Sequence, residues 1–266
     1  MRTLFAFIAL LLFGAIGVGC GGGGDDDDGD STAEASVAEP RPTRVPRSER
    51  RAPERLTANY APRLEPAGFV DFIDNPYFPL IPFTTFVYEG ETDSGQEQVE
   101  VQVSNETRLI LGIRATVVFE RISLNGDLVE STANFYAQDT DGNVWYLGQE
   151  REDFSGTVVT TFGSFEAGVD GAHAGIVMLA DPQVGDEYLQ EYYPGVAEDY
   201  AKVLAVDANA NVALGQHENC LKTEDINPFQ ARIVRNRFYC AGVGLVLVVT
   251  VRGGDDRIEL IQIIEE

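Results

Sequence analysis

The stretch QEQVEVQVS, residues 96–104, decides the fold class of this chain. Its valines, Val99, Val101 and Val103, alternate with glutamine and glutamate side chains. Successive side chains of a β-strand point to opposite faces, so this spacing places the valines on one face and the polar groups on the other. A period of two therefore predicts a strand that is buried on one side only.

Comparable short runs fill most of the chain beyond Phe86, and no long helical period competes with them. Turn signals separate the runs, including Asn125-Gly126 and residues 141–143, 185–186 and 253–255. We therefore predict an all-β domain, an antiparallel, meander-like sheet of about ten strands that curls into a barrel, half-barrel or sandwich. The further predicted strands lie in RATVVFERIS (114–123), LVESTANFYAQ (128–138), NVWYLGQE (143–150), TVVTTFGSF (157–165), DEYLQEYY (186–193), YAKVLAVD (200–207), NRFYCAGVG (236–244), LVLVVTVR (245–252) and RIELIQIIEE (257–266).

The N-terminus has the pattern of an export signal. Arg2 supplies a positive end, and residues 4–18 are almost wholly apolar but shorter than the roughly 20 residues that cross a bilayer. Small residues precede Cys20, so the segment resembles the lipobox of a bacterial lipoprotein. This resemblance implies a signal peptide over residues 1–19, an acylated Cys20 and the lipid bilayer as partner. The alternative is an ordinary secretory signal.

A tether is predicted over residues 20–65. Its first part is rich in glycine and aspartate, and its second part is rich in proline, alanine, serine and arginine. Such a segment lacks the apolar surface that would offset the entropy of ordering it, so we expect it to be disordered. The tether leads to one predicted domain, the acidic all-β domain of residues 66–266. The export signal and the acylated cysteine predict that the protein is extracytoplasmic, on the cell membrane or outer membrane.

Charge restricts the partners. The chain has 19 Lys and Arg against 43 Asp and Glu, a net charge of −24. A surface of this sign repels nucleic acid, so no nucleic-acid partner is expected. A small molecule or another envelope component remains compatible with it.

Two cysteines remain once Cys20 is assigned to the anchor. Cys220 and Cys240 lie in strand-like segments, NCLKTEDI (219–226) and NRFYCAGVG (236–244). An even pair in an exported domain tends to form a bridge, so we predict a disulfide between them, with two buried thiols as the alternative.

The segment 165–187 is the least strand-like part of the domain and supplies the candidate site. A long loop inside a compact domain is often functional, although a structural loop over the end of the sheet is the simpler reading. No nucleophile elbow or phosphate-binding glycine loop occurs, and we assign no catalytic residue, cofactor or metal. The candidate site residues are Glu166, Asp170, His173, Asp181 and Asp186. The aromatic residues Tyr188, Tyr192, Tyr193 and Tyr200 are either core residues or the lining of a ligand cavity.

Four long segments are similar to an uncharacterised family of exported bacterial β-rich proteins. The similarity covers roughly residues 70–266 and implies an exported β-rich domain, without catalytic or binding residues to carry over. Phe83 occupies a position before the first strand where the family pattern has glycine. The segments are residues 75–90, 134–150, 165–204 and 220–249.

The favoured function is therefore a ligand- or partner-binding module on a membrane-anchored lipoprotein. A carboxylate-dependent hydrolase that uses the 165–187 loop is one alternative, and a structural envelope protein is another. The absence of a recognisable nucleophile, base and orienting group favours binding or structure over catalysis.

Overall fold

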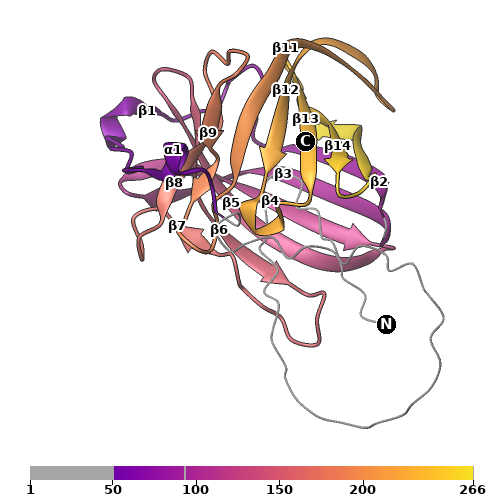
Figure 1. Cartoon of the computed structure of the whole chain (residues 1–266), viewed down its shortest axis with the longest axis horizontal. Coiled ribbons are helices and arrows are strands. Elements are labelled where there is room, and N and C mark those ends of the chain that lie inside the picture. Colours follow the sequence, from indigo (N-terminus) through magenta and orange to yellow (C-terminus); the bar gives the residue numbers. More distant parts are fainter. Residues whose placement is uncertain (1–50, 93, 266) are drawn as a thin grey trace, which may run out of the picture.

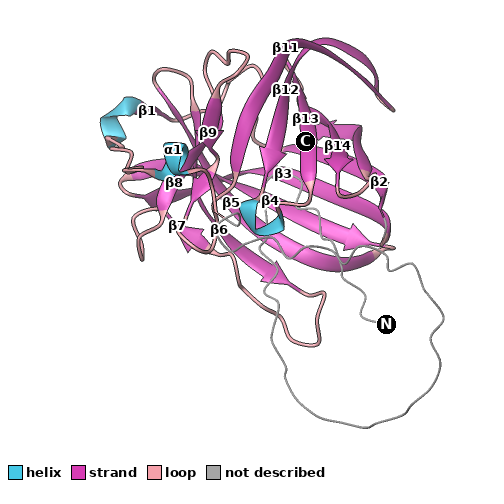
Figure 2. Cartoon of the chain, viewed as in Figure 1, coloured by secondary structure: helices cyan, strands magenta, loops and turns pink. Residues whose placement is uncertain are grey.

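The computed structural model describes residues 51–92 and 94–265, and it confirms the all-β fold class (Figures 1 and 2). The predicted signal peptide, Cys20 and the first part of the predicted tether lie outside the described residues. Within this part of the chain, no helix is long and apolar enough to cross a membrane. One short helix, α1 (Glu54–Thr57), and two 3₁₀ turns (Pro66–Gly68 and Pro228–Gln230) accompany the strands.

Fifteen strands of the described residues form one sheet that is built from two antiparallel meanders. The first meander runs from β2 to β6, the second runs from β11 to β15, and β15 pairs with β2 to join them. The strands are β1 (Phe69–Val70), β2 (Thr84–Thr92), β3 (Gly95–Ile110), β4 (Ile113–Leu124), β5 (Asp127–Asp139), β6 (Val144–Asp153), β7 (Phe165–Glu166), β8 (His173–Met178), β9 (Glu187–Leu189), β10 (Glu191–Tyr192), β11 (Tyr200–Val212), β12 (Gly215–Ile226), β13 (Val234–Cys240), β14 (Gly244–Arg252) and β15 (Arg257–Glu265).

The two ends of the sheet meet at the segment 187–192. There β9 pairs with β11 and β10 pairs with β8, and only Gln190 separates β9 from β10 in sequence. The sheet is therefore nearly closed into a barrel, one of the three forms that the sequence left open. Gly175 on β8 lies against this seam, because a Cβ atom there would come within 2.2 Å of the Gln190 carbonyl.

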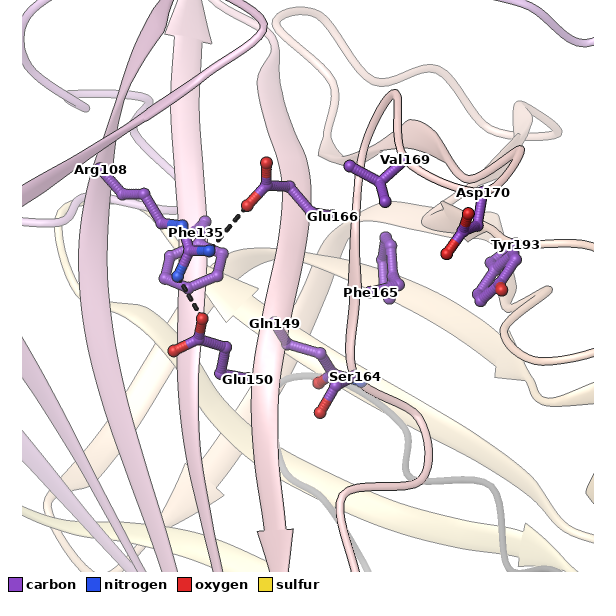
Figure 3. Close-up of a pocket in the computed structure, with 10 residues that line it drawn as sticks. All are labelled: Arg108, Phe135, Gln149, Glu150, Ser164, Phe165, Glu166, Val169, Asp170 and Tyr193. Atoms are coloured by element: carbon purple, nitrogen blue, oxygen red, sulfur yellow. Dashed lines mark hydrogen bonds and ion pairs between the residues drawn. The ribbon is translucent and has the colours of Figure 1, made fainter.

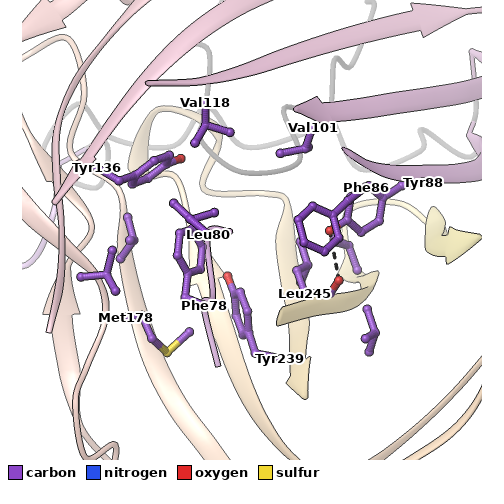
Figure 4. Packing of buried hydrophobic residues seen from close by; sticks show 14 of the residues in the cluster. Phe78, Leu80, Phe86, Tyr88, Val101, Val118, Tyr136, Met178, Tyr239 and Leu245 are labelled. Atoms are coloured by element: carbon purple, nitrogen blue, oxygen red, sulfur yellow. Dashed lines mark hydrogen bonds between the residues drawn. The ribbon is translucent and has the colours of Figure 1, made fainter. Parts of the chain in front are cut away.

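The interior of the barrel carries the main hydrophobic core. The predicted alternation is confirmed in β3, where Val99, Val101 and Val103 are at most 1 % exposed. The connection between β1 and β2 adds Phe78, whose ring packs 5.4 Å from that of Tyr136 (Figure 4). Full burial of side chains of this kind stabilises a fold by roughly 1.5–3 kcal/mol each.

One predicted strand is wrong. Residues 157–165 alternate in the manner of a strand, but only Phe165 at their end belongs to one, β7. The remaining residues form a connection in which Thr160 makes an isolated bridge to Asp153. This apolar run has no continuous neighbouring strand to receive its backbone hydrogen bonds, and such bonds are required for a strand.

Residues 51–65 also differ from the expectation of a disordered tether, because they contact the barrel. The backbone N–H of Ala52 donates to a Glu198 carboxylate oxygen at 3.0 Å, and Arg51 forms an ion pair with the same carboxylate at 2.6 Å. The Tyr60 hydroxyl donates to a backbone carbonyl of β8 at 2.9 Å. Two arginines of this segment, Arg51 and Arg55, therefore have acidic partners, Glu198 and Glu187, near the barrel seam.

The predicted disulfide is present. Cys220 on β12 and Cys240 on β13 lie opposite each other on neighbouring antiparallel strands, with 4.3 Å between their Cα atoms. Both residues are at most 3 % exposed.

Replacing Cys220 and Cys240 together by alanine should destabilise the domain by about 3 kcal/mol. The bridge closes a loop with a sequence separation of 20, and a loop of this size restricts the unfolded chain by about that amount. Guanidinium unfolding of oxidised wild type and of the double variant measures the difference. Equal midpoints and slopes would contradict it.

Candidate functional site

A pocket of about 220 Å³ opens on the barrel wall near β7 and is the strongest candidate site (Figure 3). Strands β3, β5 and β6 supply one side of it, and β7, the loop 167–172 and Tyr193 supply the other. The residues that line it are Arg108, Phe135, Gln149, Glu150, Ser164, Phe165, Glu166, Val169, Asp170 and Tyr193.

Arg108 organises the first side of the pocket. Its guanidinium donates to Glu166 at 2.7 Å and also to Glu150, and it lies 4.6 Å from the centre of the Phe135 ring. The hydrogen bond to Glu150 is the main cause that raises the pKa of Arg108. The two glutamates thus hold one cation in place, and the stacking on Phe135 fixes its orientation.

The second side combines aromatic rings with a carboxylate. Phe165 packs 6.4 Å from Tyr193, centre to centre, and Figure 3 shows Asp170 beside these rings. Within residues 51–92 and 94–265, the Asp170 carboxylate makes no hydrogen bond or ion pair. Asp170 also has a φ of 51°, in the left-handed region that non-glycine residues rarely adopt. Such a conformation is often found at functional sites.

Backbone hydrogen bonds fold the loop 167–172 back on itself. The Val169 N–H donates to the Glu166 carbonyl at 3.1 Å, and the Gly168 N–H donates to the Ala172 carbonyl at 2.9 Å. Gly168 has a φ of 87°, and a Cβ atom there would lie 2.5 Å from the Leu111 side chain. A glycine is therefore required at this point, and the loop presents Asp170 at the pocket.

The structure separates the five candidate residues of the 165–187 segment into three places. Glu166 and Asp170 both line the pocket. His173 lies on β8, where its ring stacks on that of Tyr192 with 5.9 Å between the ring centres. The remaining two acids belong to one turn: Gln183 donates from its side chain to Asp181 at 3.0 Å and from its backbone to Asp186 at 2.8 Å. Of the four tyrosines that were candidates for a cavity lining, Tyr193 lines this pocket.

Two buried acids form a second polar group at the barrel seam. Glu191 and Asp199 are both 0 % exposed, and as carboxylates they have no donor among the described residues. Burial raises the pKa of Glu191 to about 8 and that of Asp199 well above its ordinary value. Protonation of one acid supplies a hydrogen bond between the two. A third buried acid nearby, Asp225, forms an ion pair with Arg237 at 3.3 Å.

The described residues contain no group of three or more His, Cys, Asp or Glu side chains arranged to hold a metal ion. The lining of the pocket itself offers carboxylates, one guanidinium held by two glutamates, and aromatic rings.

Comparisons with known proteins do not add a function. No protein-family model matches the chain, and no curated protein is similar to it in sequence. Among solved structures, a candidate lipoprotein from Parabacteroides distasonis ATCC 8503 is similar with a TM-score of 0.40 and 12 % identity, over 71 % of this chain and 99 % of that one. These comparisons assign neither an activity nor a ligand to the site.

Proposed function

We propose that this protein is a membrane-anchored, extracytoplasmic lipoprotein whose β-barrel binds a small organic cation in the pocket beside Arg108. The observation that carries the proposal is the Asp170 carboxylate, which has no partner among the described residues and stands next to the Phe165 and Tyr193 rings.

The charges and rings of the pocket favour a cation. The lining contains three carboxylates, Glu150, Glu166 and Asp170, and one guanidinium, so acids are in excess. Asp170 remains to pair with a positive group of the ligand, because the two glutamates already hold Arg108. Aromatic faces attract ammonium groups, and small concave sites with a few polar groups are typical of ligand binding. The volume of about 220 Å³ restricts the ligand to a compact molecule.

The arrangement favours binding over the hydrolase that the sequence left open. A carboxylate-dependent hydrolase needs one acid to donate a proton and another to attack or to activate water. In this pocket Glu150 and Glu166 both accept hydrogen bonds from the same guanidinium, so Asp170 is the one carboxylate of the lining that has no partner among the described residues, and the pair of acids that a hydrolase needs is not present.

The anchor is tested by Cys20→Ser. We expect this change to move the protein from the membrane fraction to the soluble fraction, because the acyl chains on the cysteine contribute about 0.8 kcal/mol per buried CH₂. Fractionation followed by immunoblotting measures the distribution. Retention of the variant in the membrane at the wild-type level would contradict the anchor.

The ligand class is tested by Asp170→Asn. Isothermal titration of the purified full chain with a panel of small ammonium compounds should show saturable binding that weakens at least tenfold in this variant, because the countercharge is lost. Asp127→Asn is the matched control, since Asp127 is also an exposed acid without a partner among the described residues, at the β4–β5 turn. Equal affinities in wild type and Asp170→Asn would overturn the assignment.

A further inference from the structure

The connection between β6 and β7 has an uncharged surface, which is unusual in so acidic a chain. From Phe154 to Phe165 it contains no charged residue, although 23 % of the whole chain is charged. Residues 155–162 are eight consecutive exposed residues. We call residues 154–164 the apolar loop.

Three large apolar side chains of this loop face solvent. Val158 is 71 % exposed, Val159 is 51 % exposed and Phe162 is 45 % exposed. Figure 1 shows the loop projecting below the barrel. A cluster of exposed apolar side chains on a projecting loop is typical of an interaction site.

Hydrogen bonds to β6 hold the base of the apolar loop, so its tip has a defined position relative to the barrel. Asp153 and Thr160 exchange two backbone hydrogen bonds, at 2.8 and 3.1 Å. The buried Arg151 side chain donates to the Phe162 carbonyl at 3.1 Å, and the Gln149 side chain donates to the Gly163 carbonyl at 2.8 Å. The apolar tip is therefore supported by buried polar groups of β6.

We propose that the apolar loop docks the barrel on the bilayer, with Val158, Val159 and Phe162 inserted at the level of the lipid headgroups. The inference rests on the proposed lipid anchor. Acylation at Cys20 keeps the domain at the membrane surface, and the 31 residue steps from Cys20 to Arg51 reach at most about 110 Å when extended. An anionic lipid surface repels the acidic faces of the barrel. The uncharged loop is not repelled by the lipid charges, and transfer of its valine and phenylalanine side chains out of water lowers the free energy.

Depth measurement on the lipidated full chain tests the proposal. The environment-sensitive fluorophore NBD is attached at Val158→Cys and, as the control, at Leu214→Cys. Leu214 is 46 % exposed in the β11–β12 turn, which Figure 1 shows far from the apolar loop. The three native cysteines are the proposed lipid attachment site and the disulfide pair, so the introduced thiol takes the label.

The labelled proteins are reconstituted in vesicles of phosphatidylcholine and phosphatidylglycerol that contain brominated lipid. We expect a blue-shifted emission and at least threefold stronger bromolipid quenching at position 158 than at position 214. Circular dichroism confirms that both labelled variants are folded.

Flotation of the same samples separates the failure of this inference from failure of the anchor. If the protein does not float with the vesicles, both the anchor and the docking are refuted. If it floats but the label at position 158 stays water-exposed, the docking alone is refuted. A blue shift without bromolipid quenching would also refute it, because the apolar loop would then be covered by protein, such as a second copy of the chain.

Discussion

Replacing Glu191 by glutamine is expected to make the domain more stable than wild type at pH 8, by about 3–4 kcal/mol, and to change its stability little at pH 5. Burial raises the pKa of this carboxyl from 4.5 to about 8 in the folded protein. Between these two values the folded protein keeps a proton that the unfolded chain releases. Rising pH therefore favours unfolding, by about 1.4 kcal/mol per pH unit for one such group.

The neighbours of Glu191 also predict that the wild-type domain loses stability as the pH rises. Asp199 shares the site and its pKa is also raised by burial, while Arg237 and Asp225 form an ion pair close to Asp199. A glutamine at position 191 supplies a permanent donor to Asp199 without a charge of its own. Glu97, whose pKa burial also raises to about 8, should leave some dependence on pH in the variant.

Urea unfolding at pH 5 and pH 8 measures the effect. Glu106→Gln is the matched control, because Glu106 is an exposed glutamate on β3 whose side chain has no partner among the described residues. If both variants kept the wild-type dependence on pH, the buried pair would not be the cause.

Replacing Arg151 by methionine should cost about 3–5 kcal/mol, the range for removing one partner of a buried ion pair. Arg151 and Glu130 have side chains that are at most 3 % exposed, with 2.6 Å between the charged groups. The same guanidinium also binds Asp153 at 2.9 Å and the Phe162 carbonyl at 3.1 Å. The variant leaves a buried carboxylate without its cation, and this desolvated charge accounts for most of the loss.

A double-mutant cycle tests the cause of the loss. Adding Glu130→Gln to Arg151→Met should recover part of the stability, because the buried charge is then absent. Arg114→Met is the control for an exposed pair: Arg114 lies 3.4 Å from Asp71, with side chains 63 % and 83 % exposed, and its loss should cost less than about 1 kcal/mol. Similar costs in the two single variants would contradict a buried ion pair.

The sequence was sufficient to predict most of the strands and many of the turns, because these depend on neighbouring residues. It did not predict β8 (His173–Met178), which lies inside the segment 165–187 that we expected to be a loop. The valine alternation of residues 96–104 produced a strand, and Asn125-Gly126 formed a tight turn with φ values of 53° and 89°. Phe83, at a position where we expected glycine, adopts a φ of 69°. Such local signals do not show whether a partner strand is present, which is why residues 157–165 were predicted incorrectly.

The pocket could be predicted only in part, because its residues come from distant strands. Glu166 and Asp170 were identified from an irregular, acid-containing segment, but Arg108 is 58 residues from Glu166 and nothing in its local sequence marks it. The buried pair Glu191 and Asp199 was also missed. Glu191 lies on the short strand β10 and Asp199 lies just before β11, so both resemble solvated acids in the sequence, and here the closure of the barrel buries them.

A methyl NMR titration of the purified full chain with tetramethylammonium tests the central claim, binding of a small cation in this pocket, most directly. Val169 lines the pocket and is 48 % exposed, whereas Val251 on β14 is 49 % exposed and lies outside the pocket lining. The account predicts that the Val169 methyl signals shift saturably while those of Val251 stay in place. Unchanged Val169 signals at saturating cation, or equal shifts at both valines, would contradict it.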